Sequence, residues 1–166
     1  YYNSLQPRTE ADCIKSNHAS IAEMKADGEV GTESIKRYLL NALLQMSKAF
    51  NRSVGLNGEQ LELTIDLILE DPVLPNLKLD DIKLCFRRAM TGEYGEIYSI
   101  DPNIVLTWLK RYFRGRILAG ERVSQEEHAA ELAKPINRNA SWRKAVEDLA
   151  RHMSEARPHT NKQRQR

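Results

Sequence analysis

Arginine, lysine and tyrosine side chains gather between residues 83 and 116, and these residue types bind phosphate and stack on bases. Arginine and lysine neutralise phosphate groups, and an exposed tyrosine ring offers a flat surface to a base. The same pattern is also typical of a solvated helix face beside buried aromatic residues. We interpret the set as a candidate nucleic-acid or partner binding site, made of Lys83, Arg87, Arg88, Tyr94, Tyr98, Lys110, Arg111, Arg114 and Arg116.

Residue types that catalyse reactions or bind metals show no comparable pattern. The carboxylates nearest the basic residues are explained by helix capping and by turns, since acid-base chemistry needs carboxylates that converge on one point. The four histidines lie in segments that we expect to be exposed, without the spacing of a zinc site. We therefore expect no enzyme, no catalytic residue, no metal site and no cofactor. The two cysteines, Cys13 and Cys85, are too few and too far apart for a disulfide framework, and we expect both to be reduced.

A helix and a turn are expected to position the first half of the basic set. The helix begins at Leu79, and Asp80 or Asp81 is expected to cap it, because a carboxylate in a first turn accepts unpaired amide hydrogens. Its apolar residues recur at helical spacing, while most of its basic residues fall on other faces. Gly92 and Gly95 then favour a turn, since glycine adopts left-handed conformations at little cost.

A second amphipathic helix is expected to carry the other basic residues. Asp101 followed by Pro102 is a helix start, because proline fits the first helical position and an aspartate before it caps. Trp108 lies on the apolar stripe of this helix and is expected in the core. Gly115 and Gly120 are expected to weaken its end.

The rest of the chain also has helical periodicity. Residues 61–69 alternate as a strand would, but helical spacing preceded by the cap Asn57 favours a helix. Proline and glycine separate the segments. The further helices that we expect cover residues 10–27, with Gly28 and Gly31 after them, then 32–50, 58–70, 124–134 and 141–149.

These elements predict an all-α fold of about five to seven helices around a central helix-turn-helix-like pair. We expect one domain over residues 1–156, with a flexible arm at 1–9, and a disordered basic tail at 157–166. The net charge is +2, and residues 121–166 carry 10 Lys and Arg against 7 Asp and Glu. No apolar run approaches the roughly 20 residues of a membrane span. We expect a cytoplasmic protein without a membrane partner.

The segment from Asp81 to Tyr112 resembles a stretch shared by uncharacterised small helical proteins of bacterial prophages and other mobile elements. The resemblance covers about a quarter of the chain and implies a replication-accessory role only through association with replication genes. The matching positions are Phe86, Arg87, Gly92, Tyr94, Gly95, Tyr98, Asp101, Trp108 and Tyr112.

Two functional hypotheses follow from the sequence. The first is a non-enzymatic binding module of a mobile element or prophage that contacts DNA, RNA or a replication protein through its basic helical surface. The alternative is a protein-protein adaptor or regulatory subunit with no nucleic-acid contact. Salt dependence separates the two, because phosphate contacts release counterions and an apolar interface does not.

Overall fold

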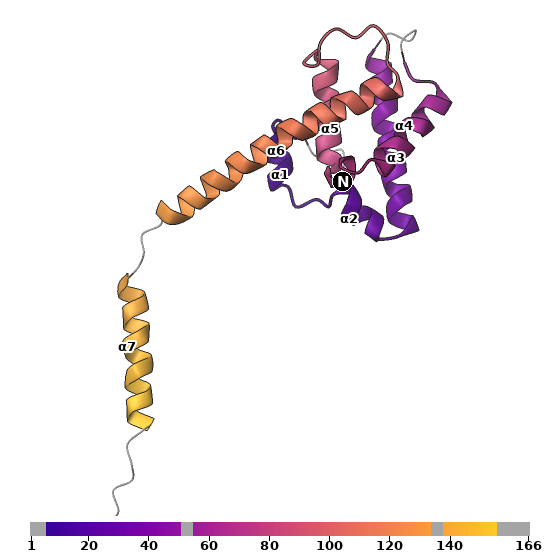
Figure 1. The fold of residues 1–166 in the computed structure, drawn as a ribbon. Helices are drawn as coiled ribbons and strands as arrows, with labels where there is room; N and C mark the ends of the chain where they lie inside the picture. Colours follow the sequence, from indigo (N-terminus) through magenta and orange to yellow (C-terminus); the bar gives the residue numbers. More distant parts are fainter. Residues whose placement is uncertain (1–5, 51–54, 134–137, 156–166) are drawn as a thin grey trace, which may run out of the picture. The chain divides into compact units, whose positions relative to one another are not determined.

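The computed structural model describes residues 6–50, 55–133 and 138–155, and every regular element in these ranges is a helix (Figure 1). The predicted all-α class is therefore confirmed. Inter-residue contacts divide the chain into a unit of residues Tyr1–Glu126 and a unit of residues Glu127–Arg166, and each is described by itself. The elements are α1 (Glu10–Lys15), α2 (Ile21–Ala26), α3 (Glu29–Ala49), α4 (Gly58–Glu70), the 3-10 helix η2 (Leu74–Asn76), α5 (Leu79–Met90), α6 (Pro102–Ala133) and α7 (Arg138–Glu155).

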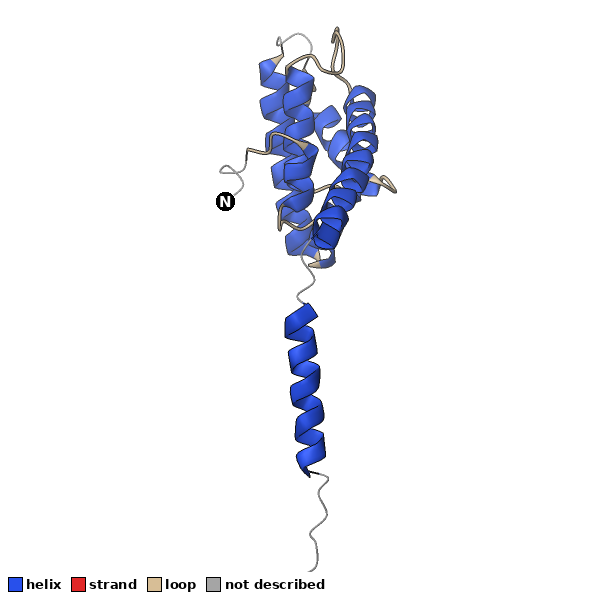
Figure 2. Ribbon diagram, turned by 90° about the vertical axis from the view of Figure 1, so that its left-hand side faces the viewer, coloured by secondary structure: helices blue, strands red, loops and turns tan. Residues whose placement is uncertain are grey.

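The first unit is built around α3, which packs against α2, α4 and α5, while α1 packs against α5. Figure 2 shows that the described elements are helices joined by loops. Ile35, Leu39 and Leu43 recur every four residues on α3 and are completely buried. Ile82 of α5 and Leu109 of α6 are also completely buried in this core. One apolar face from each helix thus forms a single core.

Trp108 lies in the core, as its spacing predicted, with 5% of its surface exposed. Its indole stacks on Phe50 and on Tyr94, with ring centroids 6.3 and 6.2 Å away. The predicted start of its helix is also confirmed, because the Ile104 amide donates to Asp101 Oδ1 at 2.9 Å. The start of α6 is thereby fixed by a cap and by aromatic packing.

The expected single helix over residues 10–27 is wrong, because α1 and α2 are separate helices. Thr9 and Ser20 each cap a helix of their own, and each forms a reciprocal capping box. Between the helices, Ser20 forms an isolated antiparallel bridge with Lys78, immediately before α5. The first helix therefore ends at Lys15, a second begins after the local cap Ser20, and the bridge to Lys78 adds a contact with a distant segment.

Gly31 was expected to follow a helix end, but it lies in the first turns of α3. The helix begins at Glu29, after Gly28 adopts a φ of 78°. A Cβ atom at Gly31 would lie 1.9 Å from the carbonyl oxygen of Met24. Glycine is required here by the close approach of α2 rather than by a turn.

The turn after α5 forms where Gly92 and Gly95 predicted it, whereas the following helix does not end at its glycines as expected. Gly92 and Gly95 have φ values of 81° and 102°. In contrast, α6 continues through Gly115 and Gly120 to Ala133, and the separate helix expected over 124–134 is part of it. A side-chain atom of Glu10 lies 3.8 Å from a Cβ position at Gly115, so this glycine lies close to α1.

The remaining expectations concern α4, the start of the last helix, and the arm and tail at the two ends of the chain. Residues 61–69 are helical within α4, whose N-cap Asn57 forms a reciprocal capping box with Gln60. The last helix begins at Arg138, before the expected start at Ser141. Of the expected arm, residues 6–9 are described, and Pro7 among them is buried. The remainder of the arm, residues 1–5, and the predicted tail 157–166 lie outside the described residues.

Candidate functional site

Arg116, one of the predicted binding residues, points into the protein and pairs with Asp81. Its Nε donates to the two carboxylate oxygens of Asp81 at 3.0 and 2.9 Å. The Asp81 side chain is completely buried and also accepts a hydrogen bond from the Tyr112 hydroxyl at 2.8 Å. Burial raises the pKa of Tyr112, with the Asp81 charge as the next cause, so the hydroxyl stays protonated as a donor. This arginine joins α5 to α6.

Arg88 also faces inward and pairs with α1. Its Nη2 donates to Glu10 Oε2 at 2.9 Å, and Nη1 makes a parallel bond to Oε1. The guanidinium lies 5.7 Å from the ring centroid of Tyr112 and reaches Glu93 at 3.4 Å. The hydrogen bond from Arg88 lowers the pKa of Glu10. A fork-to-fork pair with one-fifth of each side chain exposed is a structural contact.

Asp80 is 4% exposed and binds the loop between α1 and α2. Its Oδ2 accepts from Ser16 Oγ at 3.1 Å and lies 2.6 Å from His18 Nδ1. His18 lies in a segment expected to be exposed, and its side chain is partly exposed, at 21%, because it contacts Asp80. Lys78 strengthens the same attachment by donating from Nζ to the Ile14 and Ser16 carbonyls at 3.1 and 2.6 Å.

Neither Asp80 nor Asp81 is the N-cap of α5, so that expectation is corrected. Lys78 occupies the cap position, and its backbone amide donates a hydrogen bond at 2.8 Å to Oδ2 of Asp81, three residues later in the first turn.

We refer to Glu10, Asp80, Asp81, Arg88 and Arg116 as the buried ionic cluster. Asp81 accepts hydrogen bonds from the Lys78 amide, the Tyr112 hydroxyl and the Arg116 guanidinium.

The predicted residues on α6 and in the turn before it have different environments. Lys110 pairs with Asp71 at 2.8 Å. Arg111 lies 5.4 Å from the ring centroid of Tyr94. Tyr98 is 83% exposed and donates to Glu96 Oε2 at 2.6 Å, and Arg114 is exposed. Arg111, Arg114 and Tyr98 are thus the members of the predicted set that lie most clearly at the surface.

The two cysteine thiols are buried and reduced, as expected. Burial raises the pKa of the Cys13 and Cys85 thiols to about 12, far from the value of an activated nucleophile. The hydroxyls of Tyr112 and Tyr94 lie 3.6 Å from the sulfur atoms of Cys13 and Cys85 respectively. Both thiols are packing groups of the core.

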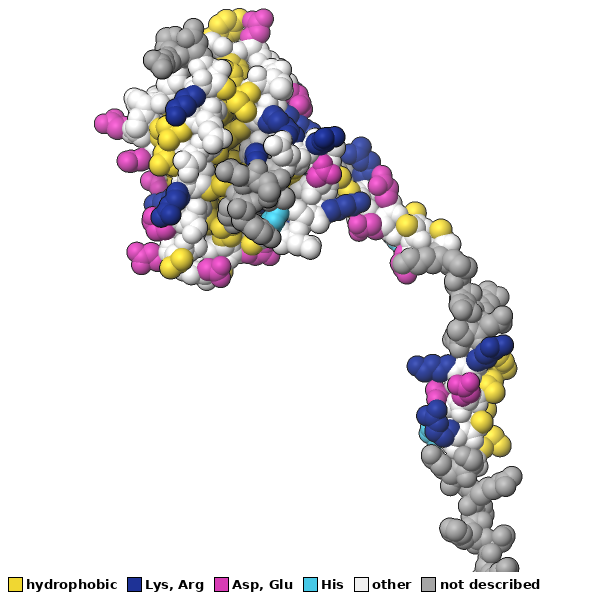
Figure 3. Space-filling model, turned by 180° about the vertical axis from the view of Figure 1, so that it is seen from behind, with side chains coloured by type: hydrophobic (Ala, Val, Ile, Leu, Met, Phe, Trp, Pro, Cys, Tyr) yellow, Lys and Arg dark blue, Asp and Glu magenta, His cyan; other side chains and the backbone are white. Residues whose placement is uncertain are grey.

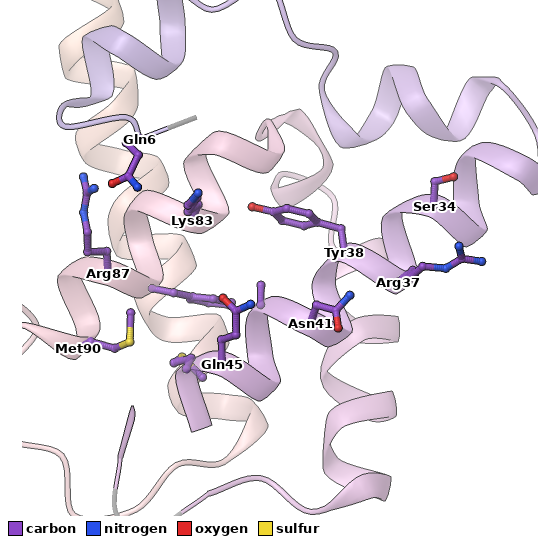
Figure 4. A pocket seen from close by; sticks show the side chains of 12 residues that line it. Gln6, Ser34, Arg37, Tyr38, Asn41, Gln45, Lys83, Arg87 and Met90 are labelled. Carbon is purple, nitrogen blue, oxygen red and sulfur yellow. The ribbon is translucent and has the colours of Figure 1, made fainter. Parts of the chain in front are cut away.

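The remaining two predicted residues, Lys83 and Arg87, line a groove between α3 and α5 of about 720 Å³ (Figure 4). Arg87 Nη2 also donates to the carbonyl of Pro7. In the view of Figure 4, Arg37 and Ser34 lie at one end of the groove, and Arg87 and Met90 at the other. The lining residues are Gln6, Ser34, Arg37, Tyr38, Asn41, Ala42, Gln45, Met46, Lys83, Phe86, Arg87 and Met90.

The groove combines an apolar floor with a polar, cationic rim. Phe86 and Met46 are buried at 3% and 1% exposure, while Arg37 is exposed. The Tyr38 hydroxyl donates to the Leu79 carbonyl at 3.0 Å, which fixes that ring between the helices. Within the part of the chain that the structure describes, no aspartate or glutamate lines this groove. We call it the α3/α5 groove.

Sequence reasoning missed the contribution of α3 to the groove. Ser34, Tyr38, Asn41 and Gln45 recur at i, i+4, i+7 and i+11, which is the spacing of one helix face. None of these polar residues belongs to the set of binding residues predicted from the sequence. The periodic polar stripe was the available signal.

The described residues contain neither a candidate metal site nor a candidate membrane span. No group of three or more His, Cys, Asp or Glu side chains there has the arrangement of a metal site. No helix within 6–50, 55–133 or 138–155 is both long and apolar enough to cross a membrane. In the comparisons with known proteins, no family model, curated protein or solved structure matches the chain.

Proposed function

We propose that this chain is a non-enzymatic interaction module that binds an acidic polypeptide segment in the α3/α5 groove. The observation that carries the proposal is the composition of the groove: three cationic side chains, Arg37, Lys83 and Arg87, surround an apolar floor. A positive, partly apolar groove is complementary to an amphipathic segment with carboxylates along one side. The adaptor hypothesis is therefore the one that we favour.

The dimensions of the groove suit a short helix. Its α3 side runs from Ser34 to Gln45, which at a rise of 1.5 Å per residue is about 17 Å, or three helical turns. Phe86 and Met46 would contact the apolar side of such a ligand. Asn41 and Gln45 supply amide groups that can donate to its polar side. Binding of such a peptide segment in the groove would not require nucleic acid.

Internal pairing of the basic residues favours a protein partner over a nucleic acid. Arg88, Lys110 and Arg116 each have a carboxylate within 3 Å, so phosphate would have to compete with an existing ion pair. A nucleic-acid site needs several cations that face one backbone. The resemblance to proteins of mobile elements makes a replication protein the first partner to test.

Contact with single-stranded nucleic acid is the second candidate, and exposed residues beside the turn before α6 favour it. Tyr98 is 83% exposed, and the guanidinium of Arg111 lies over the Tyr94 ring. With Arg114, these groups offer the combination of a stacking ring and phosphate-neutralising charges. This surface is distinct from the groove, so the two candidates respond to different substitutions.

Fluorescence anisotropy with a labelled peptide tests the proposal. The probe is an amphipathic helical peptide with glutamates on one side, and its control replaces each glutamate with glutamine. We expect the acidic peptide to bind at least about tenfold more tightly, since each charge-assisted contact contributes about 1 kcal/mol or more. Equal affinity for the two peptides would contradict an acidic ligand.

Two charge-reversal variants locate the site. Lys83→Glu places a negative charge in the groove and should weaken peptide binding by at least about tenfold. Arg114→Glu makes the same charge change on exposed α6 and should leave that affinity nearly unchanged. If Arg114→Glu instead abolishes binding to a labelled single-stranded oligonucleotide while the peptide does not bind, the second candidate replaces the first.

A further inference from the structure

The last helix, α7, has an exposed apolar stripe that belongs to neither candidate site. Trp142, Val146, Leu149 and Met153 recur at spacings of four, three and four residues, and their exposed fractions are 71, 44, 62 and 67%. Figure 3 shows hydrophobic side chains along one side of this helix and charged side chains, both basic and acidic, mostly on the other. Single exposed apolar residues need no explanation, but a periodic stripe of four indicates an interface.

The stripe has the pattern of a helix-pairing seam. Spacings of four and three residues repeat every seven positions, which places the four side chains at the a and d positions of a two-heptad coiled coil. Ala145 and Ala150 lie at the two edges of the stripe, and side chains this small allow a second helix to approach closely. The seam therefore suits another helix better than it suits a flat surface.

We propose that two copies of this chain associate through α7 as an antiparallel helix pair. In that arrangement Trp142 of one copy packs against Met153 of the other, and Val146 packs against Leu149. Each layer combines a larger side chain with a more flexible or smaller one, and a thioether beside an aromatic ring is a favourable contact. A parallel pair would instead place the two Trp142 rings against each other.

The distribution of charge supports the antiparallel direction. Residues 156–166 carry four Lys and Arg and no Asp or Glu. A parallel pair would bring these two basic segments together. In an antiparallel pair the C-termini of the two α7 helices lie at opposite ends of the pair. The 18 residues of α7 span about 27 Å, several times the roughly 8 Å Debye length at physiological salt. Repulsion between them is then screened.

The edges of the seam support the same direction. Antiparallel pairing places Arg143 of one copy beside Ala150 of the other, where the long side chain can cover a small one. His152 takes the same position relative to Ala145. The polar side of α7 carries charges of both signs, such as Lys144 and Glu147, so it lacks the row of carboxylates that the α3/α5 groove would select.

The size of the interface predicts a weak dimer. Two helices of this length bury less than the roughly 1,600 Å² of a standard stable interface. The association should therefore depend on concentration, with monomers at low micromolar and dimers at high micromolar concentration. A dimer would also present two α3/α5 grooves, although the proposed pairing does not depend on what they bind.

Sedimentation equilibrium of the full chain tests the association. The mean mass should rise with concentration from 19.1 kDa toward twice that value. Leu149→Gln should weaken dimerisation at least about tenfold, while Glu147→Gln, a change on the polar face of the same helix, should alter it less than about twofold. Denaturant unfolding, followed through buried Trp108, should be unchanged in both variants because α7 lies outside the first unit. A chain that is monomeric at all concentrations overturns the proposal and leaves the stripe to another partner.

Disulfide trapping tests the direction. Chains that carry Arg143→Cys, mixed with chains that carry Ala150→Cys, should cross-link rapidly in an antiparallel pair. Chains with Ala145→Cys, mixed with those carrying Ala150→Cys, should cross-link only in a parallel pair. The native thiols Cys13 and Cys85 are buried and do not compete. Preferential cross-linking in the second mixture overturns the antiparallel arrangement, and loss of both by Leu149→Gln confirms that the seam brings the helices together.

Discussion

The two sides of α5 both have basic residues, but the environments of these residues differ. On one side Arg88 pairs with Glu10 from α1, and Asp81 receives Arg116 from α6. On the other side Lys83 and Arg87 line the α3/α5 groove. The difference arises from the neighbouring helices, since α1 supplies a carboxylate and α3 supplies amides, hydroxyls and Arg37. Counting cations on a helix therefore does not identify a binding surface until the carboxylates that meet them are known.

The two sides should also differ in what they contribute to the free energy of unfolding. A buried pair adds little net stability relative to an apolar replacement, because both ions lose hydration on folding. Removing one partner is costly, since the other charge is left buried without compensation. Lys83 and Arg87 are partly exposed, so their removal should cost less than removal of the completely buried Asp81. Stability measurements can therefore separate the two sides.

The largest effect is expected for Asp81→Ala in the buried ionic cluster. The variant leaves the Arg116 guanidinium and the Tyr112 hydroxyl without their acceptor, and we expect a loss of about 3 to 5 kcal/mol in a denaturant titration. Asp66→Ala is the control, because Asp66 is 56% exposed and pairs with Lys36 at 3.5 Å. It should cost less than about 0.5 kcal/mol. Similar losses in the two variants would mean that Asp81 is hydrated and that the cluster is not a structural unit.

A smaller effect is expected for Arg88→Met, and it should depend on pH. The partly exposed pair with Glu10 should contribute about 1 to 2 kcal/mol at neutral pH, somewhat less than a fully buried charged hydrogen bond. Because Arg88 lowers the pKa of Glu10, this stability is fully present above the unfolded carboxyl value near 4.3 and is lost as the pH falls through the folded value. Unfolding titrations from neutral pH into acid should show the wild type and the variant converging. A difference that is constant with pH would assign the effect of Arg88 to packing on Tyr112.

The smallest effect on stability is expected for Lys83→Gln on the groove side. The substitution keeps a polar side chain of similar length, so the free energy of unfolding should change by less than about 0.5 kcal/mol. Binding of the acidic peptide should nevertheless weaken, as a charge has been removed from the groove. A loss above 1 kcal/mol in the denaturant titration would show that Lys83 is structural and would remove the contrast between the two sides of α5.

Local patterns in the sequence were sufficient for much of the fold. The caps at Asn57 and Asp101, the glycine turn at Gly95 and the buried position of Trp108 each depend on neighbours within a few residues or on helical spacing. The break between α1 and α2 was missed although Ser20 and Glu23 have the local spacing of a capping box, and the bridge from Ser20 to Lys78 that accompanies the break could not be inferred from local spacing. Helix periodicity contains no information about such contacts.

The site was predicted less well for the same reason. Arg88 meets Glu10 across 78 residues, and His18 meets Asp80 across 62 residues. Nothing in the local sequence distinguishes Arg88 from Arg87, its neighbour in the same helix, although one pairs with a carboxylate and the other lines a groove. Of the groove-lining residues, Lys83 and Arg87 were in the predicted set, whereas the polar stripe on α3 was present in the sequence but was not assigned to it.

The attachment of α1 to α5 also has a consequence for the order in which this protein acquires its structure during synthesis. The Glu10 carboxylate cannot form its ion pair until Arg88, 78 residues later in the chain, has been synthesised. At a synthesis rate of about 5 to 20 residues per second, that interval is roughly 4 to 16 s, far longer than the microseconds in which helices form. Helices α2, α3 and α4 can therefore pack together while α1 is still without its neighbours. The first helix to leave the ribosome is among the last to be fixed in place.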